Sequence, residues 1–319
     1  MTRMTHRPAI AIHLTGLRKT YPPRGAAPAK EALKGIDLAI PTGSFFGLLG
    51  PNGAGKSTLI GILAGLVRKT AGTARVWDVD LDADPIGLRR QIGVVPQELN
   101  LDPFFTPREV VEQQAGLFGV PRSRRRTMEI LDAVGLADKA DAYARSLSGG
   151  MRRRLLVAKA MVHSPPVLVL DEPTAGVDIE LREQLWRMVR GLNEAGTTIV
   201  LTTHYLEEAE ALCDRIAIIG EGRLIAHDTT HDLIARMDDK ALVVTLDRDL
   251  ETVPPNLLPF APALEPPRRL VLRYRAREAR VEAILDAVRA AGLPILDIST
   301  READLNAIFL RLTREARAA

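Results

Sequence analysis

The sequence predicts an α/β domain with a largely parallel sheet, followed by a smaller α+β domain. From about Ile10 to Met237, short β-rich segments alternate with helical patterns, as in sheets whose parallel strands are joined by helices. Three segments are continuously apolar, as expected of strands buried on both faces: "SFFGLLG", "PVLVLDE" and "TTIVLTTH". Each ends in polar residues, which would lie at the carboxyl edge of the sheet, where such folds bind ligands.

Two further regions flank or interrupt this pattern. Residues 106–163 show helical patterns and no strong strand signal, so we expect a helical segment inserted into the first domain. After Met237 the chain changes to short strands, the proline-rich stretch "VPPNLLPFAPALEPP" and two helical patterns. We therefore expect an α/β domain over residues 1–237 and a small α+β domain over residues 238–319, which is long enough to fold compactly.

Composition indicates a folded, soluble chain. Of the 319 residues 46% are hydrophobic and 26% charged, and the formal net charge is +3. The basic runs at residues 122–126 and 152–154 are interpreted as solvated helix faces. The alternative is that they contact RNA, phospholipid headgroups or acidic partners. No direct nucleic-acid partner is expected. The single cysteine, Cys213, excludes an intramolecular disulfide and fits a reducing cytoplasm. The first residues, "MTRMTHRPAIAIHLTGL", lack an apolar segment of signal-peptide length, and no window reaches 18 uninterrupted apolar residues. We therefore expect a chain that neither crosses a membrane nor is exported.

The stretch "GPNGAGKST" fits a loop that binds nucleotide phosphates. Gly50, Gly55, Lys56 and Ser57 stand at the positions of the P-loop pattern, directly after a predicted strand and before a predicted helix. In such a loop the backbone N–H groups surround the β-phosphate. Lys56 would reach the β- and γ-phosphates, and the Ser57 hydroxyl would ligate Mg²⁺.

The strand "VLVLDE" supplies the acids that nucleotide hydrolysis requires. Asp171 at its end can hold Mg²⁺ through water, and Glu172 beside it can polarise an attacking water. An apolar strand that ends in acids is common. Together with the P-loop it predicts a nucleotide-hydrolysing site.

A second phosphate site is predicted at "LSGGMRRR". Ser148, Gly149 and Gly150 stand where a helix begins, and the unpaired N–H groups and dipole of a helix N-terminus favour an anion. The chain therefore has two candidate phosphate sites, well separated in the sequence.

The order of these motifs resembles one family. The chain resembles the ATP-binding subunits of ABC transporters in having, in this order, "LSGGM", a basic helix, "LVLDEPTAGVD" and "TTH". The resemblance extends over the first domain. It implies the P-loop NTPase fold of an ABC cassette, with a mostly parallel core sheet, an antiparallel β subdomain and the helical insertion. It also implies ATP and Mg²⁺ as substrate and cofactor.

The resemblance assigns roles to residues that the motifs alone do not. Tyr21 matches the aromatic that stacks on adenine, although it can also be read as an ordinary strand tyrosine. Gln97 matches the glutamine that touches Mg²⁺ and relays nucleotide state, His204 the histidine at the γ-phosphate, and Asp178 a residue that couples two sites. The implied catalytic residues are Glu172, His204 and Gln97, and the implied Mg²⁺ ligands are Ser57, Gln97 and Asp171. Nucleotide contacts are further implied for Asn52, Gly53, Gly55, Lys56, Ser57 and Thr58.

In this family two cassettes pack head to tail. The resemblance implies that Ser148, Gly149 and Gly150 of one copy close over the ATP held by the P-loop of another. Loss of the γ-phosphate on hydrolysis would loosen this dimer. One departure is Met151, where the family's most familiar signature has Gln; activity is expected to survive because that side chain points away from the phosphate.

The stretches around "THYLEEAEALCDRIAIIGEGRLIA" and the final "ADLNAIFLRLT" look like cassettes that serve drug, lipid or polysaccharide exporters. This implies a separate integral membrane permease as partner and a peripheral location on the cytoplasmic face of the membrane. The alternatives are a soluble ABC ATPase acting on ribosomes or DNA, and an importer cassette. For the C-terminal domain, regulation of the dimer and simple capping of the fold stay open.

Overall fold

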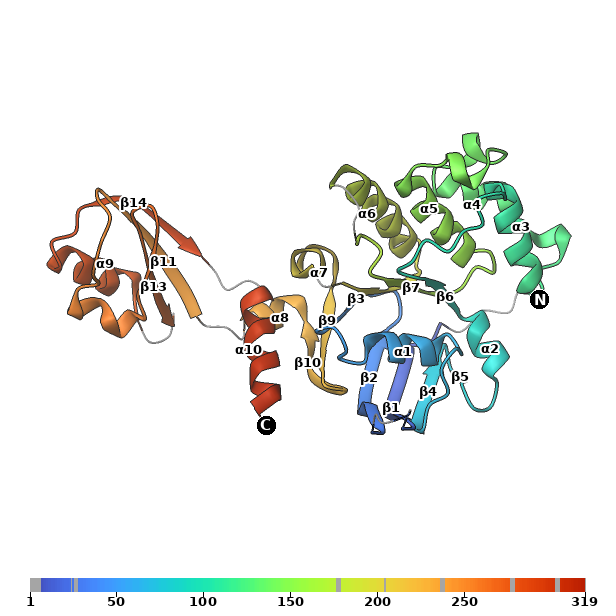
Figure 1. Ribbon diagram of the computed structural model, residues 1–319, viewed down its shortest axis with the longest axis horizontal. Coiled ribbons are helices and arrows are strands. Elements are labelled where there is room, and N and C mark those ends of the chain that lie inside the picture. Colours follow the sequence, from blue (N-terminus) through green and yellow to red (C-terminus); the bar gives the residue numbers. More distant parts are fainter. Residues whose placement is uncertain are drawn as a thin grey trace. The chain divides into compact units, whose positions relative to one another are not determined.

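The computed structural model of the chain describes residues 7–23, 25, 28–175, 179–203, 205–235, 239–275, 279–301 and 305–318. The chain divides into two compact units, one comprising Met1–Asp228 with Thr313–Ala319 and the other Thr229–Leu312 (Figure 1). The first unit ends before the predicted boundary between residues 237 and 238, and that boundary itself lies outside the described residues.

The first unit contains two sheets. A four-stranded antiparallel sheet has the order β2-β1-β4-β5, with β1 at Ile10–Tyr21, β2 at Lys30–Pro41, β4 at Ala71–Val76 and β5 at Val79–Asp80. A six-stranded sheet has the order β10-β9-β3-β8-β7-β6. Its strands are β3 (Phe45–Leu49), β6 (Ile92–Val95), β7 (Val167–Asp171), β8 (Thr198–Thr202), β9 (Arg215–Gly220) and β10 (Arg223–Thr229).

The three strands predicted from apolar runs are β3, β7 and β8, and they are neighbours or next neighbours in the larger sheet. β3 pairs in parallel with β8 on one side and β9 on the other, and all five of its residues are buried. β7 pairs in parallel with β8 and β6. The prediction of an α/β fold with a mostly parallel core sheet is confirmed.

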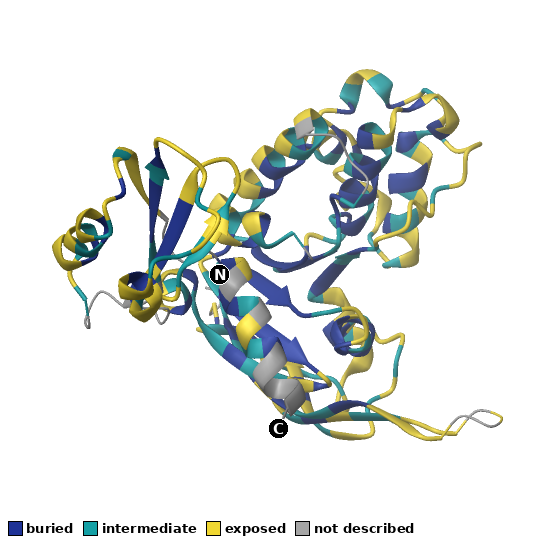
Figure 2. Ribbon diagram, turned by 60° about the vertical axis from the view of Figure 1, so that its left-hand side comes forward, coloured by how far each residue is buried: buried dark blue, intermediate teal, exposed yellow. Residues whose placement is uncertain are grey.

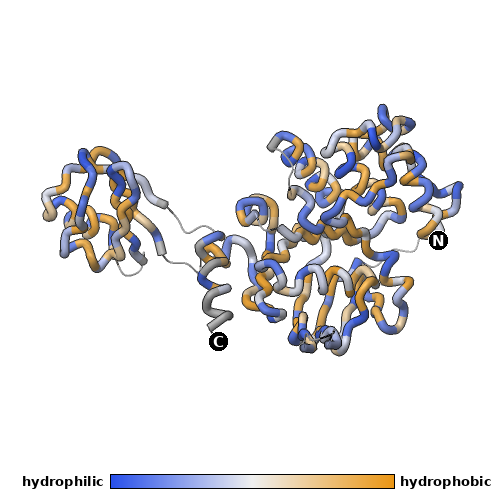
Figure 3. Tube along the Cα trace, in the orientation of Figure 1, coloured by the Kyte–Doolittle hydropathy of each residue, from blue (hydrophilic) through white to orange (hydrophobic). Residues whose placement is uncertain are grey.

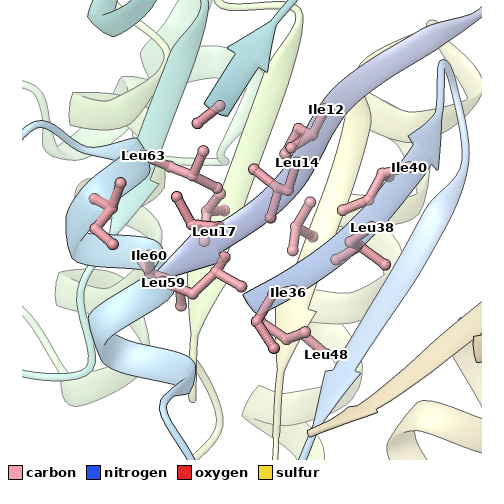
Figure 4. Packing of buried hydrophobic residues seen from close by; sticks show 14 of the residues in the cluster. Ile12, Leu14, Leu17, Ile36, Leu38, Ile40, Leu48, Leu59, Ile60 and Leu63 are labelled. Atoms are coloured by element: carbon pink, nitrogen blue, oxygen red, sulfur yellow. The ribbon is translucent and has the colours of Figure 1, made fainter. Parts of the chain in front are cut away.

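Helix α1 (Lys56–Leu63) packs into the main apolar core between the two sheets. Figure 4 shows Leu59, Ile60 and Leu63 of this helix close to side chains of β1 and β2. Full burial of one such leucine stabilises a fold by about 1.5–3 kcal/mol. The burial of α1 thereby fixes the helix whose first residue is Lys56.

The helical segment (residues 106–163) has an apolar core of its own, built from α3, α4 and α5. α3 (Pro107–Leu117) begins with a capping box in which the Thr106 hydroxyl accepts from the Glu109 amide and the Glu109 carboxylate accepts from the Thr106 amide. α4 spans Thr127–Ala133 and α5 spans Gly149–Ala160, and every residue of the segment is described and none lies in a strand. α2 (Pro85–Arg90), α6 (Ile179–Glu194) and α7 (Leu206–Leu212) also belong to the unit.

The second unit is a separate α+β structure. Its antiparallel sheet has the order β12-β13-β11-β14, with β11 at Asp239–Leu246, β12 at Ala263–Glu265, β13 at Arg269–Arg275 and β14 at Ile295–Arg301. Helices α8 (Thr230–Ala235) and α9 (Val281–Ala290) belong to it, and α10 (Leu305–Ala318) follows. Figure 2 shows α9 with its exposed residues outward, and Ile284 and Val288 on its other face are buried in the unit's own core.

Apolar residues gather along the strands of these sheets, as the hydropathy colouring in Figure 3 shows. Among the residues that the structure describes, no helix is both long and apolar enough to cross a membrane.

His163, just beyond α5, joins the helical segment to the main sheet. Its ring stacks on Phe118 with centroids 3.9 Å apart and planes 5° apart, and its Nε2 donates to the Ile92 carbonyl at 3.2 Å. Burial of the ring lowers the pKa of His163 from 6.5 to about 4. The folded chain thus holds this imidazole neutral.

We expect the first unit to lose stability as the pH falls from 6.5 toward 4. In that window the unfolded chain takes up a proton at His163 while the folded chain does not, so protonation favours unfolding. Urea unfolding of the wild type and of His163→Phe across this range measures the effect. The variant should show a shallower fall of the free energy of unfolding with pH, and equal slopes would contradict the assignment.

Candidate nucleotide site

Parallel pairing brings the ends of three strands to one edge of the main sheet. The P-loop starts at Gly50 directly after β3, Asp171 is the last residue of β7, and Thr202 is the last residue of β8. β8 pairs with both of the other strands, so the three carboxyl ends are adjacent. This is the edge where ligands bind in open α/β sheets.

Close approach of backbone atoms explains the glycines of the loop. A Cβ on Gly50 would lie 2.2 Å from the Ile219 carbonyl oxygen of β9, and one on Gly55 would lie 2.7 Å from that of Ala32. Gly55 is also left-handed, with φ 112°, and precedes the first residue of α1. The loop is therefore held tightly against β2 and β9 and admits no side chain at these positions.

The start of α1 offers donors to an anion. No side chain caps this helix and its first turn contains no acid. The amides of Gly53, Gly55, Lys56 and Ser57 donate to no atom of the residues that the structure describes. Unpaired amides at the N-terminus of a helix suit a phosphate.

The side chain of Lys56 lies inside this loop and is 6% exposed. Its Nζ donates to the carbonyl oxygens of Gly50 at 2.6 Å and Pro51 at 3.3 Å. Burial lowers the pKa of Lys56, while Glu172 and Asp171 act in the opposite direction. A buried ammonium facing two carboxylates and a ring of amides is placed to share a phosphate with them.

The two acids at the end of β7, Asp171 and Glu172, are held through Thr202. The Thr202 hydroxyl donates to Asp171 Oδ1 at 2.6 Å, and the Glu172 amide donates to the Thr202 carbonyl at 3.1 Å. Glu172 has φ 44°, which is left-handed backbone and costs a non-glycine residue about 1–3 kcal/mol. Such a strained backbone conformation persists only where the surrounding structure holds it, and it is common at functional sites.

The structure brings Gln97 to the same place. It follows β6, which pairs with β7, and its Nε2 donates to Glu172 Oε2 at 3.2 Å. Thus the amide of one predicted site residue and the carboxylate of another meet above the sheet edge. Both side chains are within reach of solvent.

Tyr21, the last residue of β1, also lies next to the P-loop helix. Its hydroxyl is 3.4 Å from the hydroxyl of Thr58 in α1, and the Lys19 ammonium is 4.7 Å from its ring centroid. The side chain is 36% exposed. An accessible ring beside the start of α1 is suited to stacking on a base.

Ser148, Gly149 and Gly150 form a separate feature at the N-terminus of α5. Ser148 caps the helix by accepting from the Met151 amide at 3.3 Å. Gly150 is packed so closely that a Cβ would lie 2.7 Å from Leu181 Cδ2, whereas Gly149 faces open space. Met151 packs against the apolar core of the helical segment. Within residues 28–175 no hydrogen bond or ion pair joins Ser148 or its two glycines to the P-loop.

Two predicted site residues, Asp178 and His204, lie outside the described residues. The remaining predicted residues of the nucleotide site are all described. They form one group at the sheet edge and a second group at the start of α5.

The structure adds Glu208 to the residues around this edge. Its carboxylate is 6% exposed and accepts from the hydroxyls of Thr174 at 2.9 Å and Thr203 at 3.0 Å. Arg182 Nε lies 3.3 Å from its other oxygen. Glu208 therefore ties the segment after Glu172 to the segment after β8. In the sequence it is one acid among several in "YLEEAEAL", and only its helical spacing from the apolar face of α7 distinguishes it.

Arg153 is the second addition, and it corrects the interpretation of the basic run 152–154 as a solvated face. Its side chain is 5% exposed, and Nη1 donates to the carbonyls of Pro96 at 3.0 Å and Gln97 at 2.8 Å. In a run of like charges, the sequence does not show which side chain turns from the helix toward the protein core. The run at 122–126 differs, because Arg122, Arg124 and Arg126 are exposed there.

Comparison with known proteins agrees with this geometry. Residues 33–175 match the family described as ABC transporter. The chain is 38% identical over 310 residues to the Nod factor export ATP-binding protein I of Ralstonia nicotianae, covering 96% of this chain and 95% of the relative. It is 44% identical over 245 residues to the daunorubicin/doxorubicin resistance ATP-binding protein DrrA of Streptomyces peucetius, covering 76% and 72%. For the linearmycin resistance ATP-binding protein LnrL of Bacillus subtilis the identity is 35% over 292 residues, covering 89% and 94%.

Solved structures of similar fold include dimeric cassettes. One is a dimeric post-hydrolysis state of an ATP-binding cassette bound to ADP and Pi, with 29% identity and a TM-score of 0.60, covering 69% of this chain and 98% of that one. Another, described as the dimeric structure of a bacterial ABC transporter cassette, matches with the same values.

We expect Gly55→Ala to weaken ATP binding more strongly than Gly53→Ala. At Gly55 a Cβ meets the Ala32 carbonyl and the backbone is left-handed, so the loop must move. At Gly53, with φ 81° and open space, only backbone strain of about 1–2 kcal/mol is added. Titration with a fluorescent ATP analogue, with thermal unfolding as the control for folding, measures both. Wild-type affinity in Gly55→Ala would contradict the described loop.

Proposed function

This chain belongs to the ABC transporter family as an ATP-hydrolysing subunit of export-type transporters, and from this premise we propose that it works as one half of an ATP-driven homodimer that moves a separate membrane permease. The observation that supports this best is the presence of two phosphate-binding features on one chain. One lies at the start of α1 and the other at the start of α5.

For ATP, we assign the triphosphate to the P-loop. The amides of Gly53, Gly55, Lys56 and Ser57 hold the β-phosphate, Lys56 also reaches the β- and γ-phosphates, and Tyr21 stacks on the adenine. Lys56 gives up its carbonyl partners for phosphate oxygens, which are stronger acceptors for an ammonium. Asn52 and Thr58 complete the contacts that the family resemblance implies.

The oxygen atoms at the sheet edge fit Mg²⁺. Thr202 occupies one oxygen of Asp171, which leaves the other for the metal, and the Gln97 amide donates its N–H to Glu172, which leaves its carbonyl oxygen. The Ser57 hydroxyl is exposed in the first turn of α1. Proteins usually bind Mg²⁺ through a few side-chain oxygens, together with substrate phosphates and water. The oxygens of Asp171, Gln97 and Ser57 form such a set. When bound, Mg²⁺ would neutralise charge that develops on the phosphates.

For hydrolysis, Glu172 is the residue that orients and polarises the attacking water. Its strained backbone and its hydrogen bond from Gln97 hold the carboxylate at the sheet edge, beside the loop that binds the phosphates. His204 and Asp178 are assigned from the family resemblance to the γ-phosphate and to the link between two sites.

The second phosphate feature supports the proposed dimer. Ser148 and Gly149 are exposed at the start of α5, whereas Gly150 is buried against Leu181, and none of the three has a described link to the P-loop of its own chain. In a head-to-tail dimer they close over the γ-phosphate held by the other copy, where a helix N-terminus favours negative charge. The solved cassettes of this fold that are dimeric support such an arrangement.

The names of the relatives indicate the substrate class. They are proteins of Nod factor export and of daunorubicin and linearmycin resistance, and on this basis we propose a drug-like, lipid or polysaccharide substrate. The permease that carries it is a separate integral membrane protein. The cassette would then be attached peripherally to the cytoplasmic face of the membrane.

We expect Glu172→Gln to slow hydrolysis by about 10²–10⁴-fold while ATP binding is kept. The amide cannot accept a proton from the attacking water, whereas the phosphate contacts are unchanged, so an ATP-bound dimer accumulates. Phosphate release and size-exclusion chromatography with light scattering measure the two effects. Glu207→Gln, which changes an exposed acid of α7, is the matched control and should hydrolyse at the wild-type rate. Undiminished hydrolysis in Glu172→Gln would remove this residue from the catalytic role.

A further inference from the structure

Arg153 joins two parts of the first unit, the helix α5 and the loop that follows β6. It lies in the second turn of α5, and its guanidinium is buried. Nη1 donates to the carbonyls of Pro96 and Gln97, in the loop that follows β6. Its Nε is also buried, without a hydrogen-bond partner in the part of the chain that the structure describes. Burying a cation against two neutral carbonyls is a costly way to gain stability alone.

At one end of this connection lies the nucleotide site of the chain itself. The residue whose carbonyl Arg153 holds, Gln97, donates from its side chain to Glu172 Oε2 at 3.2 Å. If ATP and its metal shift this loop when they bind at Gln97 and Glu172, the guanidinium of Arg153 would therefore move with it.

At the other end lies the start of α5. Because α5 is a continuous helix from Gly149 to Ala160, a displacement at Arg153 is transmitted to Ser148 and the two glycines as a rigid-body movement. In the proposed dimer these residues contact the ATP of the other copy. One arginine thus bridges the groups that contact two different nucleotides.

The next residue provides an internal comparison. Arg154 makes the same kind of contact from the same helix, with Nη1 donating to the carbonyls of Val134 at 2.9 Å and Gly135 at 3.1 Å. Both of these carbonyls belong to the helical segment, so Arg154 holds α5 to its own segment. Arg153 alone of the two reaches the loop at the sheet edge.

We propose that Arg153 is a positioning residue that couples the two ATP sites of the dimer, by fixing the start of α5 relative to the loop that carries Gln97. This inference rests on the proposed head-to-tail homodimer. ATP bound in one copy orders that copy's loop and, through Arg153, presents Ser148–Gly150 to the ATP of the other copy. The coupling is reciprocal, because each site biases the same rigid connection.

ATP-driven dimerisation of the full chain in the Glu172→Gln background tests the proposal. The readout is the ATP concentration at which half of the protein is dimeric, measured by light scattering. Coupling between binding sites typically changes affinity by about 5–150-fold, so adding Arg153→Met should raise this midpoint by at least about 5-fold. Arg153→Lys, which keeps a shorter cation, should give an intermediate midpoint.

Two controls separate coupling from damage to the fold. Binding of a fluorescent ATP analogue to the dilute monomer should be the same in the parent and in the Arg153→Met protein, because the P-loop is intact. Arg154→Met removes an equivalent contact, and should shift the dimerisation midpoint much less. If Arg153→Met does not fold, the Arg153→Lys midpoint decides alone, and a value equal to that of the parent overturns the proposal.

Two other results would also overturn it. Equal midpoints for the parent and a folded Arg153→Met protein would show that the contact carries no coupling, while the homodimer itself stands. Equal shifts for Arg153→Met and Arg154→Met would show that general loosening of α5 is responsible. Failure of the parent protein to dimerise at saturating ATP would instead overturn the homodimer, and this inference with it.

Discussion

The need to present unpaired backbone amides to phosphate without losing the fold is the constraint on which this structure depends. Burial of β3 between β8 and β9, and of the apolar face of α1 in the main core, supplies the free energy that holds the P-loop in its shape. The loop then passes so close to β2 and β9 that Gly50 and Gly55 cannot carry a side chain. Four amides that pair with no described protein atom and one buried ammonium are the result.

The same constraint organises the residues around the loop. Thr202 holds Asp171 and Glu172, Gln97 donates to Glu172, and Glu208 ties the segments that follow β7 and β8 to each other. Glu208 is buried, whereas Gln97 and Glu172 reach solvent, so these contacts extend from the interior of the unit to the surface where the nucleotide would bind. Arg153 extends these contacts to the helix that begins at Gly149, which is how a local phosphate contact can reach a distant surface.

Much of this could be predicted from the sequence, and the limits have physical causes. Apolar runs bounded by glycine and acids predicted β3, β7 and β8, because strands buried on both faces must be continuously apolar. The P-loop and the acids at the end of β7 were predicted because a glycine-rich motif and an apolar strand that ends in acids are visible in the sequence, and parallel strands bring their carboxyl ends to one sheet edge. Arg153 and Glu208 were not predicted, because burial of a charged side chain depends on its three-dimensional neighbours. Nothing in the run of arginines marks Arg153, and only its helical spacing distinguishes Glu208 from the acids beside it. The roles assigned to the site residues remain proposals.

The central claim is that the two phosphate-binding features of one chain act on nucleotides held by different copies. Mixing two separately inactive variants tests it most directly: Lys56→Ala, which removes the phosphate-binding ammonium, and Ser148→Arg, which blocks the start of α5. In a head-to-tail dimer of the two, one site combines the intact P-loop of the second variant with the intact α5 of the first. The account predicts that the mixture hydrolyses ATP well above either variant alone. A mixture no more active than its components would contradict it.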